Sequence, residues 1–222
     1  MLICDHASNW LPAGLDGLGL PDGELARHIA WDPGALDTAF ELAHLLDAVL
    51  VHATVSRLVL DVNRDPEHPG SIVSASEDTL IPGNQSLELS ERSRRVTDIY
   101  EPYHQAVAEV IAERPDPRVV AIHSFTPVYR GQHRPWHIGV LSARDRRMAD
   151  PLLAGLRSDP ALVVGDNQPY APADGIYHTL ARHCEPRALR SVMLELRADL
   201  VSTARSQQIW ARRLASTLRG IH

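Results

Sequence analysis

The sequence has few cysteines and no long apolar run, and each shortage excludes a class of protein. Its 222 residues include two cysteines, Cys4 and Cys184, which are too few and too far apart for a disulfide framework. No apolar stretch reaches the ~18–20 residues that span a bilayer, and no basic segment precedes an apolar stretch and a cleavage site. We therefore expect a cytoplasmic protein with no membrane partner.

Positive charge of the kind that binds nucleic acid is also scarce. All 22 Lys and Arg positions are arginine, they are outnumbered by 28 Asp and Glu, and the formal net charge is −6. Binding to a phosphate backbone needs clustered basic residues, and the sequence has no basic stripe. We expect no nucleic-acid partner. The preference for arginine suits recognition of small anions, or it reflects the composition of the genome.

What the sequence does have is an alternation of short apolar runs with amphipathic segments, in a chain long enough for one sizeable core. Apolar runs predict strands at residues 1–4, 50–53, 58–62, 119–122, 138–141, 162–164 and 191–196. Helical spacing predicts helices at residues 24–49 with a break at 31–34, 87–112 with a kink at Pro102, 148–157, 179–183 and 201–218. This order predicts a single α/β domain over residues 1–222, with a mostly parallel (mixed) central sheet and helices on both faces.

Four of the predicted strands end in polar residues that can do chemistry. The endings are Asp5-His6, Asp61-Val62-Asn63-Arg64, His123-Ser124 and Glu195-Leu196-Arg197. Ligands of open parallel sheets bind outside the carboxyl ends of the strands. We therefore expect these side chains to meet at one edge of the sheet and to form an active site.

The residue types at these endings predict metal-assisted hydrolysis. Catalytic zinc takes three protein ligands of the His and carboxylate type and leaves one position for water. His6 and His123 supply two imidazoles, and a carboxylate has to supply the third ligand. Glu195 suits a general base that takes the proton of the water. The alternative is that Glu195 is a buried carboxylate paired with Arg197 or Arg64.

Arginines near the second ending suit a substrate that carries a carboxylate. Arg64 with Asn63 would hold that carboxylate, because a guanidinium binds it through two hydrogen bonds. The alternative is a structural ion pair between Arg64 and Asp61 or Asp65. Arg57 either joins the anion site or only flanks the predicted strand. The predicted partner is thus a small molecule, and no oligomeric state is predicted.

Several motifs together resemble the N-formylglutamate amidohydrolase family. They are CDHASN, WDPGA, SRLVLDVNR, IHSF and LELR, in family order between Leu2 and about Asp199. The resemblance implies hydrolysis of the formamide of an N-formyl amino acid to formate and the free amine, with a divalent metal, usually zinc. The opening motif Asp5-His6-Ala7-Ser8-Asn9 is similar to a branch other than the best-known glutamate-specific one. The resemblance therefore carries over the reaction type more firmly than the substrate.

A more distant resemblance to zinc carboxypeptidases implies a phosphorylase/hydrolase-like fold and the remaining site residues. Their order of motifs is matched by His6, Asn63-Arg64, His123-Ser124 and Glu195-Leu196-Arg197, which adds Ser124 and Arg197 as substrate-binding candidates. Those enzymes take a Glu three residues after the first His, where this chain has Asn9. Asp32 is our candidate for the third ligand, and the alternative is that it caps the following helix.

Two further residues complete the predicted site. Arg57 would help the metal to stabilise the oxyanion, and Tyr177, or Tyr170, would donate a hydrogen bond from a loop folded over the substrate. The leading hypothesis is a zinc-dependent amidohydrolase on an N-formyl or N-acyl amino acid. The alternatives are a carboxypeptidase-like exopeptidase on short peptides, and a metal-binding or anion-binding protein without turnover.

Overall fold

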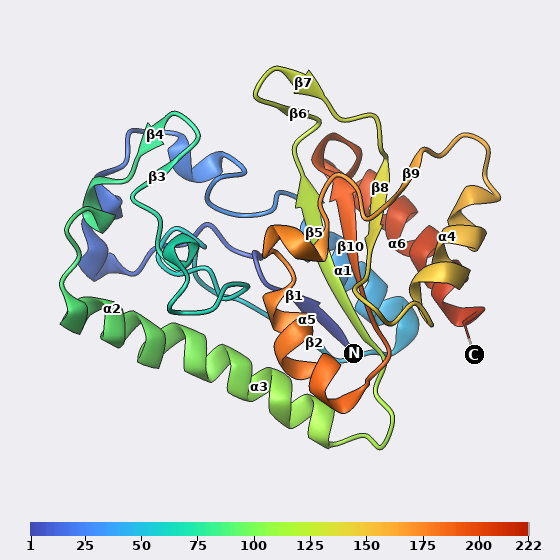
Figure 1. Cartoon of the computed structure of the whole chain (residues 1–222). Coiled ribbons are helices and arrows are strands. Elements are labelled where there is room, and N and C mark those ends of the chain that lie inside the picture. Colours follow the sequence, from blue (N-terminus) through green and yellow to red (C-terminus); the bar gives the residue numbers. More distant parts are fainter. Residues whose placement is uncertain (222) are drawn as a thin grey trace.

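A six-stranded mixed sheet runs through the middle of the computed structural model, which describes residues 1–221 and leaves His222 outside (Figure 1). The strand order is β2 (Leu50–His52), β1 (Leu2–Cys4), β5 (Val119–Phe125), β10 (Ser191–Arg197), β8 (Ile138–Leu141) and β9 (Val164–Asp166). The first four strands are mutually parallel, and β8 is antiparallel to β10. The prediction of a mostly parallel, mixed sheet in a single α/β domain is confirmed.

Helices cover both faces of this sheet, and the alternation of side chains along β5 shows why. Val120 and Ile122 belong to an apolar cluster shared with α1, α4 and α6, whereas Val119 and Ala121 belong to a second cluster shared with α3 and α5. The helices are α1 (Ala35–Leu46), α2 (Leu89–Arg95), α3 (Glu101–Ala112), α4 (Ala149–Arg157), α5 (His178–His183) and α6 (Ala204–Arg219). Among the described residues, none of these helices is long and apolar enough to cross a membrane.

The parallel strands bring the predicted polar endings to one edge of the sheet. His123 on β5 and Glu195 on β10 are direct partners in the strand register. Both follow the alternation that puts Ala121 and Met193 on the face covered by α3 and α5. The pairing of β5 with β10 thus makes neighbours of two side chains that are 72 positions apart in sequence.

The predicted strand at residues 58–62 is wrong, because this segment is a series of turns. Its apolar side chains are buried against other loops and α3 rather than in the sheet, and burial of either kind produces the same apolar run. Turn bonds satisfy the backbone instead: Val59 N–H donates to Ser56 O at 2.9 Å and Asp61 N–H to Ser71 O at 2.8 Å. Asp61, Asn63 and Arg64 therefore reach the site from a loop.

Two predicted helices also differ from the observed ones. Before the break at residues 31–34, only the short turn Glu24–Ala26 is helical, and it is a 3₁₀ turn that ends in extended backbone at Arg27. The segment 87–112 is helical from Leu89 onward, with a π turn at Val96–Tyr100 where Glu101 N–H donates to Val96 O. That wider turn lies just before Pro102, which has no N–H to continue the regular pattern.

Two long excursions of the chain, residues 5–34 and 53–88, extend beyond the sheet and lie together on one side of it (Figure 1). They share an apolar cluster of their own, formed by Leu18, Ala30, Val55, Leu58, Val59 and Ile81. They also carry the hairpin of β3 (Ala75–Ser76) and β4 (Thr79–Leu80). A second hairpin, β6 (Val128–Tyr129) with β7 (Gln132–His133), extends from the end of β5. The edge of the sheet that carries His123 and Glu195 is thereby enclosed.

The start of α1 depends on a glycine, and its replacement should be costly. Gly34 has a φ of +78°, and a Cβ there would lie 2.2 Å from the Val201 carbonyl oxygen. We expect Gly34→Ala to lower the free energy of unfolding by more than about 2 kcal/mol through backbone strain and this overlap. Chemical denaturation measures it. Gly14→Ala, where a Cβ would meet no atom within 4 Å, is the matched control and should change little.

Candidate metal centre

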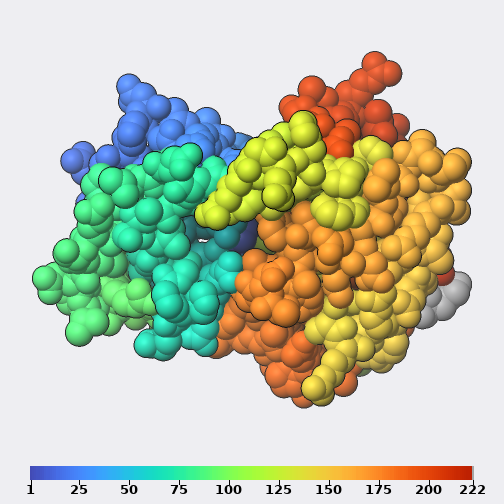
Figure 2. All heavy atoms as spheres, turned by 45° about the horizontal axis from the view of Figure 1, so that its top comes forward, coloured from blue at the N-terminus to red at the C-terminus, as the bar shows by residue number. Residues whose placement is uncertain are grey.

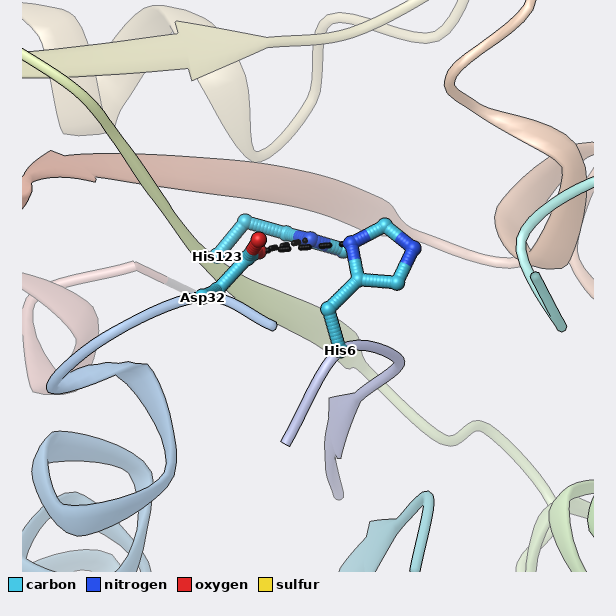
Figure 3. Close-up of side chains that lie close together, drawn as sticks. All are labelled: His6, Asp32 and His123. Carbon is cyan, nitrogen blue, oxygen red and sulfur yellow. Dashed lines mark hydrogen bonds and ion pairs between the residues drawn. The ribbon is translucent and has the colours of Figure 1, made fainter. Parts of the chain in front are cut away.

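Three side chains from separate segments point toward one another at this edge (Figure 3). The Nδ1 atoms of His6 and His123 lie 3.3 and 2.8 Å from the same oxygen, Oδ2 of Asp32. His6 follows β1, His123 lies on β5, and Asp32 precedes α1. All three are buried, and one donor atom from each lies within 4.8 Å of the others. The residues predicted as metal ligands thus come together, and the cluster could hold a metal ion.

Backbone contacts hold Asp32 in this position. Its N–H donates to His6 O at 2.9 Å, and Ser124 N–H donates to its Oδ2 at 3.3 Å. The Ser124 hydroxyl donates to the carbonyl of Pro33 at 2.8 Å. The alternative role of Asp32 as a helix cap is wrong: α1 begins at Ala35, the capping position is Gly34, and no side chain caps the helix. The Asp32 carboxylate is directed to the histidines instead.

Each imidazole is also held from behind by a second carboxylate. His6 Nε2 lies 2.7 Å from Asp61 Oδ1, and His123 Nε2 lies 2.9 Å from Asp5 Oδ2. Histidines that ligate metals usually donate their other ring N–H to a carboxylate in this way, which fixes the ring and its tautomer. The arrangement leaves both Nδ1 atoms facing Asp32.

The two supporting carboxylates are themselves supported differently. Asp5 Oδ1 accepts hydrogen bonds from the hydroxyls of Tyr103 on α3 and Thr179 on α5, both at 2.7 Å. Asp61 Oδ2 instead accepts from Arg57 Nη2 at 2.7 Å. Sequence reasoning placed Asp5 and Asp61 at strand endings and considered Asp61 as a partner of Arg64, but it did not predict that either carboxylate supports a histidine.

Buried charges compensate one another across this network. Burial raises the pKa of Asp5, but the hydrogen bond from His123 and the positive charge of that ring outweigh it and lower the pKa to about 2. Burial lowers the pKa of His123, but its bonds to Asp32 and Asp5 raise that pKa well above the ordinary value. A protonated imidazole would donate from its Nδ1 to Asp32 and from its Nε2 to the carboxylate behind it. A divalent cation would take the place of the Nδ1 protons.

Glu195 differs from the other buried carboxylates of the site. It is 5% exposed, and its Oε2 has no hydrogen-bond partner among the described residues. Burial raises its pKa, the charges of His123 and Asp32 act in opposite directions, and the result is a pKa of about 7. The alternative of a salt bridge to Arg197 or Arg64 is wrong, since within residues 1–221 neither arginine pairs with it. A carboxyl group with this pKa can both accept and release a proton near neutral pH.

The cluster opens into a cavity of about 360 Å³, a size that suits a small molecule. Strand ends and the two long excursions line it together. Of the predicted site residues, the cavity is lined by His6, Asp32, Arg57, Asn63, Arg64, His123, Ser124 and Glu195. Arg57 is the cation nearest the cluster, with Nη1 3.7 Å from Asp32 Oδ1.

Asn63 and Arg64 line the cavity, and both also hold the loop before α5. Asn63 Nδ2 donates to Ile176 O at 2.5 Å, and its Oδ1 accepts from Thr179 N–H at 2.9 Å. Arg64 Nη1 donates to Gly175 O at 2.5 Å. The Nε atom of Arg64 lies 4.0 Å from Asp61 Oδ2, so of the two predicted ion-pair partners it is Asp61 that lies nearby.

Tyr177 and Arg197, which were predicted to bind substrate, lie outside this cavity. The Tyr177 ring, just before α5, is buried in the apolar cluster that includes residues of α3, α5 and β10, and this packing turns it away from the site. Arg197, at the last position of β10, donates to Asp199 at 2.8 Å and reaches backbone carbonyls of residues 134–136. Tyr170, the other tyrosine considered, does line the cavity.

Comparison with known proteins supports the fold described above. The chain is similar to gene product Atu2144 from Agrobacterium tumefaciens, with 43% identity, a TM-score of 0.96, and coverage of 99% of this chain and 88% of that one. N-formylglutamate amidohydrolase from Ralstonia eutropha JMP134 is similar in fold, at 19% identity and a TM-score of 0.62, over 98% and 93% of the two chains. The comparison with curated proteins found no match. The family profile described as N-formylglutamate amidohydrolase matches residues 1–202, so the chain belongs to this family.

Proposed function

We propose that this protein is a zinc-dependent amidohydrolase that releases formate, or another small acyl group, from an N-acyl amino acid. One observation carries the proposal. The His6–Asp32–His123 donor set lines the same cavity of small-molecule size as Glu195, whose Oε2 has no hydrogen-bond partner among residues 1–221. Family membership supports the reaction class.

The donor set fits a divalent cation. Two imidazole nitrogens and a carboxylate oxygen are the ligands typical of catalytic zinc, and the carboxylates behind the rings supply the usual support. His6, Asp32 and His123 would hold the ion. When bound, it would polarise the amide carbonyl and lower the pKa of water.

The chain's own residues would then carry the proton and the charges. Glu195 takes a proton from the attacking water, whose oxygen joins the acyl carbon, and delivers that proton to the nitrogen as the carbon–nitrogen bond breaks. Arg57 faces the cavity beside Asp32 and would stabilise the oxyanion. The products are a carboxylic acid and a free amine, so atoms balance without another reactant.

The substrate's own carboxylate would bind near Arg64, Asn63 and Ser124. The loop contacts of Arg64 are made through Nη1. Within the described part of the chain, this leaves its Nη2 for a bound carboxylate. The cavity of about 360 Å³ suits an acylated amino acid better than a peptide of several residues.

The first experiment measures metal content and formate release together. We expect about one zinc per chain and formate from at least one member of a panel of N-formyl amino acids, with loss of both after chelation and return on adding zinc. Zinc with peptide cleavage but no formate would point to the exopeptidase. Stoichiometric zinc with no hydrolysis at all would leave only a binding protein.

Substitution of Glu195 tests the assignment of the base. Glu195→Gln keeps size and should keep zinc, but it cannot take the proton, so turnover should fall between about 100-fold and 10,000-fold. Zinc analysis and formate release on the same sample separate the two effects. Near-wild-type turnover in this variant would contradict the role.

Removal of a supporting carboxylate should weaken metal binding without touching the ligands. In Asp5→Asn, a neutral amide replaces the carboxylate that accepts the hydrogen bond from His123 Nε2. We expect the affinity for zinc to fall about 10-fold to 100-fold. Competition with a chromophoric chelator measures it. Asp98→Asn, at an exposed carboxylate far from the site, is the control and should leave the affinity unchanged. Equal affinities in all three proteins would contradict the inference.

A further inference from the structure

One wall of the cavity is aromatic. Phe125 at the end of β5, Tyr129 in the β6–β7 hairpin and Tyr170 in the loop after β9 all line it. Figure 2 shows the hairpin arching over a hollow between the excursion that carries residues 53–88 and the segment around residue 170. Phe125 is buried, whereas the two tyrosines are half-buried and keep part of their rings accessible.

Arg134 holds these three rings together. Its guanidinium lies 4.7 Å from the ring centroids of both Tyr129 and Tyr170, and 5.8 Å from that of Phe125. It also donates to the Tyr170 hydroxyl at 2.9 Å. Such cation–π contacts stabilise a fixed arrangement. The rings therefore form a preorganised apolar surface rather than a set of mobile side chains.

The charges around the cavity argue against an acidic side chain on the substrate. Its lining includes the carboxylates of Asp32, Asp61, Glu77 and Glu195 and two guanidinium groups, Arg57 and Arg64. Arg57 already pairs with Asp61, and Arg64 is the cation assigned to the substrate's own carboxylate. Among the described lining residues, no further arginine is available for a second carboxylate. An acidic side chain packed against the aromatic wall would lose hydration there without gaining a guanidinium partner from the lining.

We infer that the substrate's side chain is aromatic or bulky and apolar, and that it packs against Tyr129, Tyr170 and Phe125. It would therefore differ from the acidic side chain of N-formylglutamate, after which the family is named. This inference rests on the proposed function and specifies its substrate class. Aromatic rings gain from offset or edge-to-face contact with other rings, and Tyr129 and Tyr170 offer such contacts. The reactive amide would lie beside Glu195 and the His6–Asp32–His123 cluster, which line the same cavity.

A matched substrate series tests the inference. With zinc-loaded protein, kcat/KM for N-formylphenylalanine should exceed that for N-formylglutamate by about tenfold or more, with N-formylleucine in between. A preference for N-formylglutamate would overturn the inference and leave the proposed function intact. Absence of formate from every substrate would overturn the proposed function. Calorimetric binding of the same compounds to zinc-loaded Glu195→Gln then tests the side-chain preference without turnover, and equal or tighter binding of N-formylglutamate would overturn it.

Variants of the wall provide a second readout. Tyr129→Ala should raise KM for N-formylphenylalanine about tenfold with little change in kcat. For N-formylglycine, which has no side chain to contact the wall, KM should change less than about twofold. Phe40→Ala, at an exposed ring on α1 away from the cavity, is the control. Arg134→Met should also raise KM for N-formylphenylalanine, because the guanidinium that holds the three rings in place is lost. Selective loss of N-formylglutamate hydrolysis in Arg134→Met would instead identify Arg134 as a receptor for an acidic side chain and overturn the inference.

Discussion

The rest of the site depends on one carboxylate oxygen, Oδ2 of Asp32, which lies between the Nδ1 atoms of two imidazoles. Three buried carboxylates and two buried imidazoles would be costly if any of them lacked a partner. Here each imidazole lies between two carboxylates, and the charges compensate. The segments that carry His6, Asp32 and His123 are therefore held in one arrangement by the same contacts that prepare them for a cation.

The two imidazoles are supported in unlike ways. Asp5, behind His123, is held by hydroxyls of Tyr103 and Thr179, which belong to the helices that cover the sheet. Asp61, behind His6, is held by Arg57, which faces the cavity. One side of the cluster is thus anchored in the scaffold. The other side is connected to a cation that a bound substrate would meet.

The residues of the metal cluster and those of the aromatic wall lie on different kinds of element. The cluster and Glu195 lie on strand ends and on short segments next to them, where the sheet determines their spacing. Of the aromatic wall, Tyr129 and Tyr170 lie on a hairpin and a loop, where sequence can change without disturbing the sheet. When these two groups of residues lie on different elements, we expect members of a family to share a reaction and to differ in the side chain that they prefer.

The sequence by itself determined where most strands lie along the chain and which polar residues stand at or near the ends of three of them. Short apolar runs at residues 2–4, 119–122, 138–141 and 191–196 could only be buried, and the sheet buries them. Two of them end at His6 and His123, and the last contains Glu195, so the meeting of these residues at one edge was predictable. Asp32 was our own candidate for the third ligand, and the fold places it beside both histidines.

Tertiary structure decided the rest, because side-chain direction and partners depend on packing between distant segments. The apolar run at residues 58–62 is buried by loops, and its sequence pattern is the same as that of a buried strand. Tyr177 is turned into the core at the start of α5, although its position next to the loop favoured the site. The bond between Asp5 and His123 joins residues 118 positions apart, and no local spacing reports such a contact.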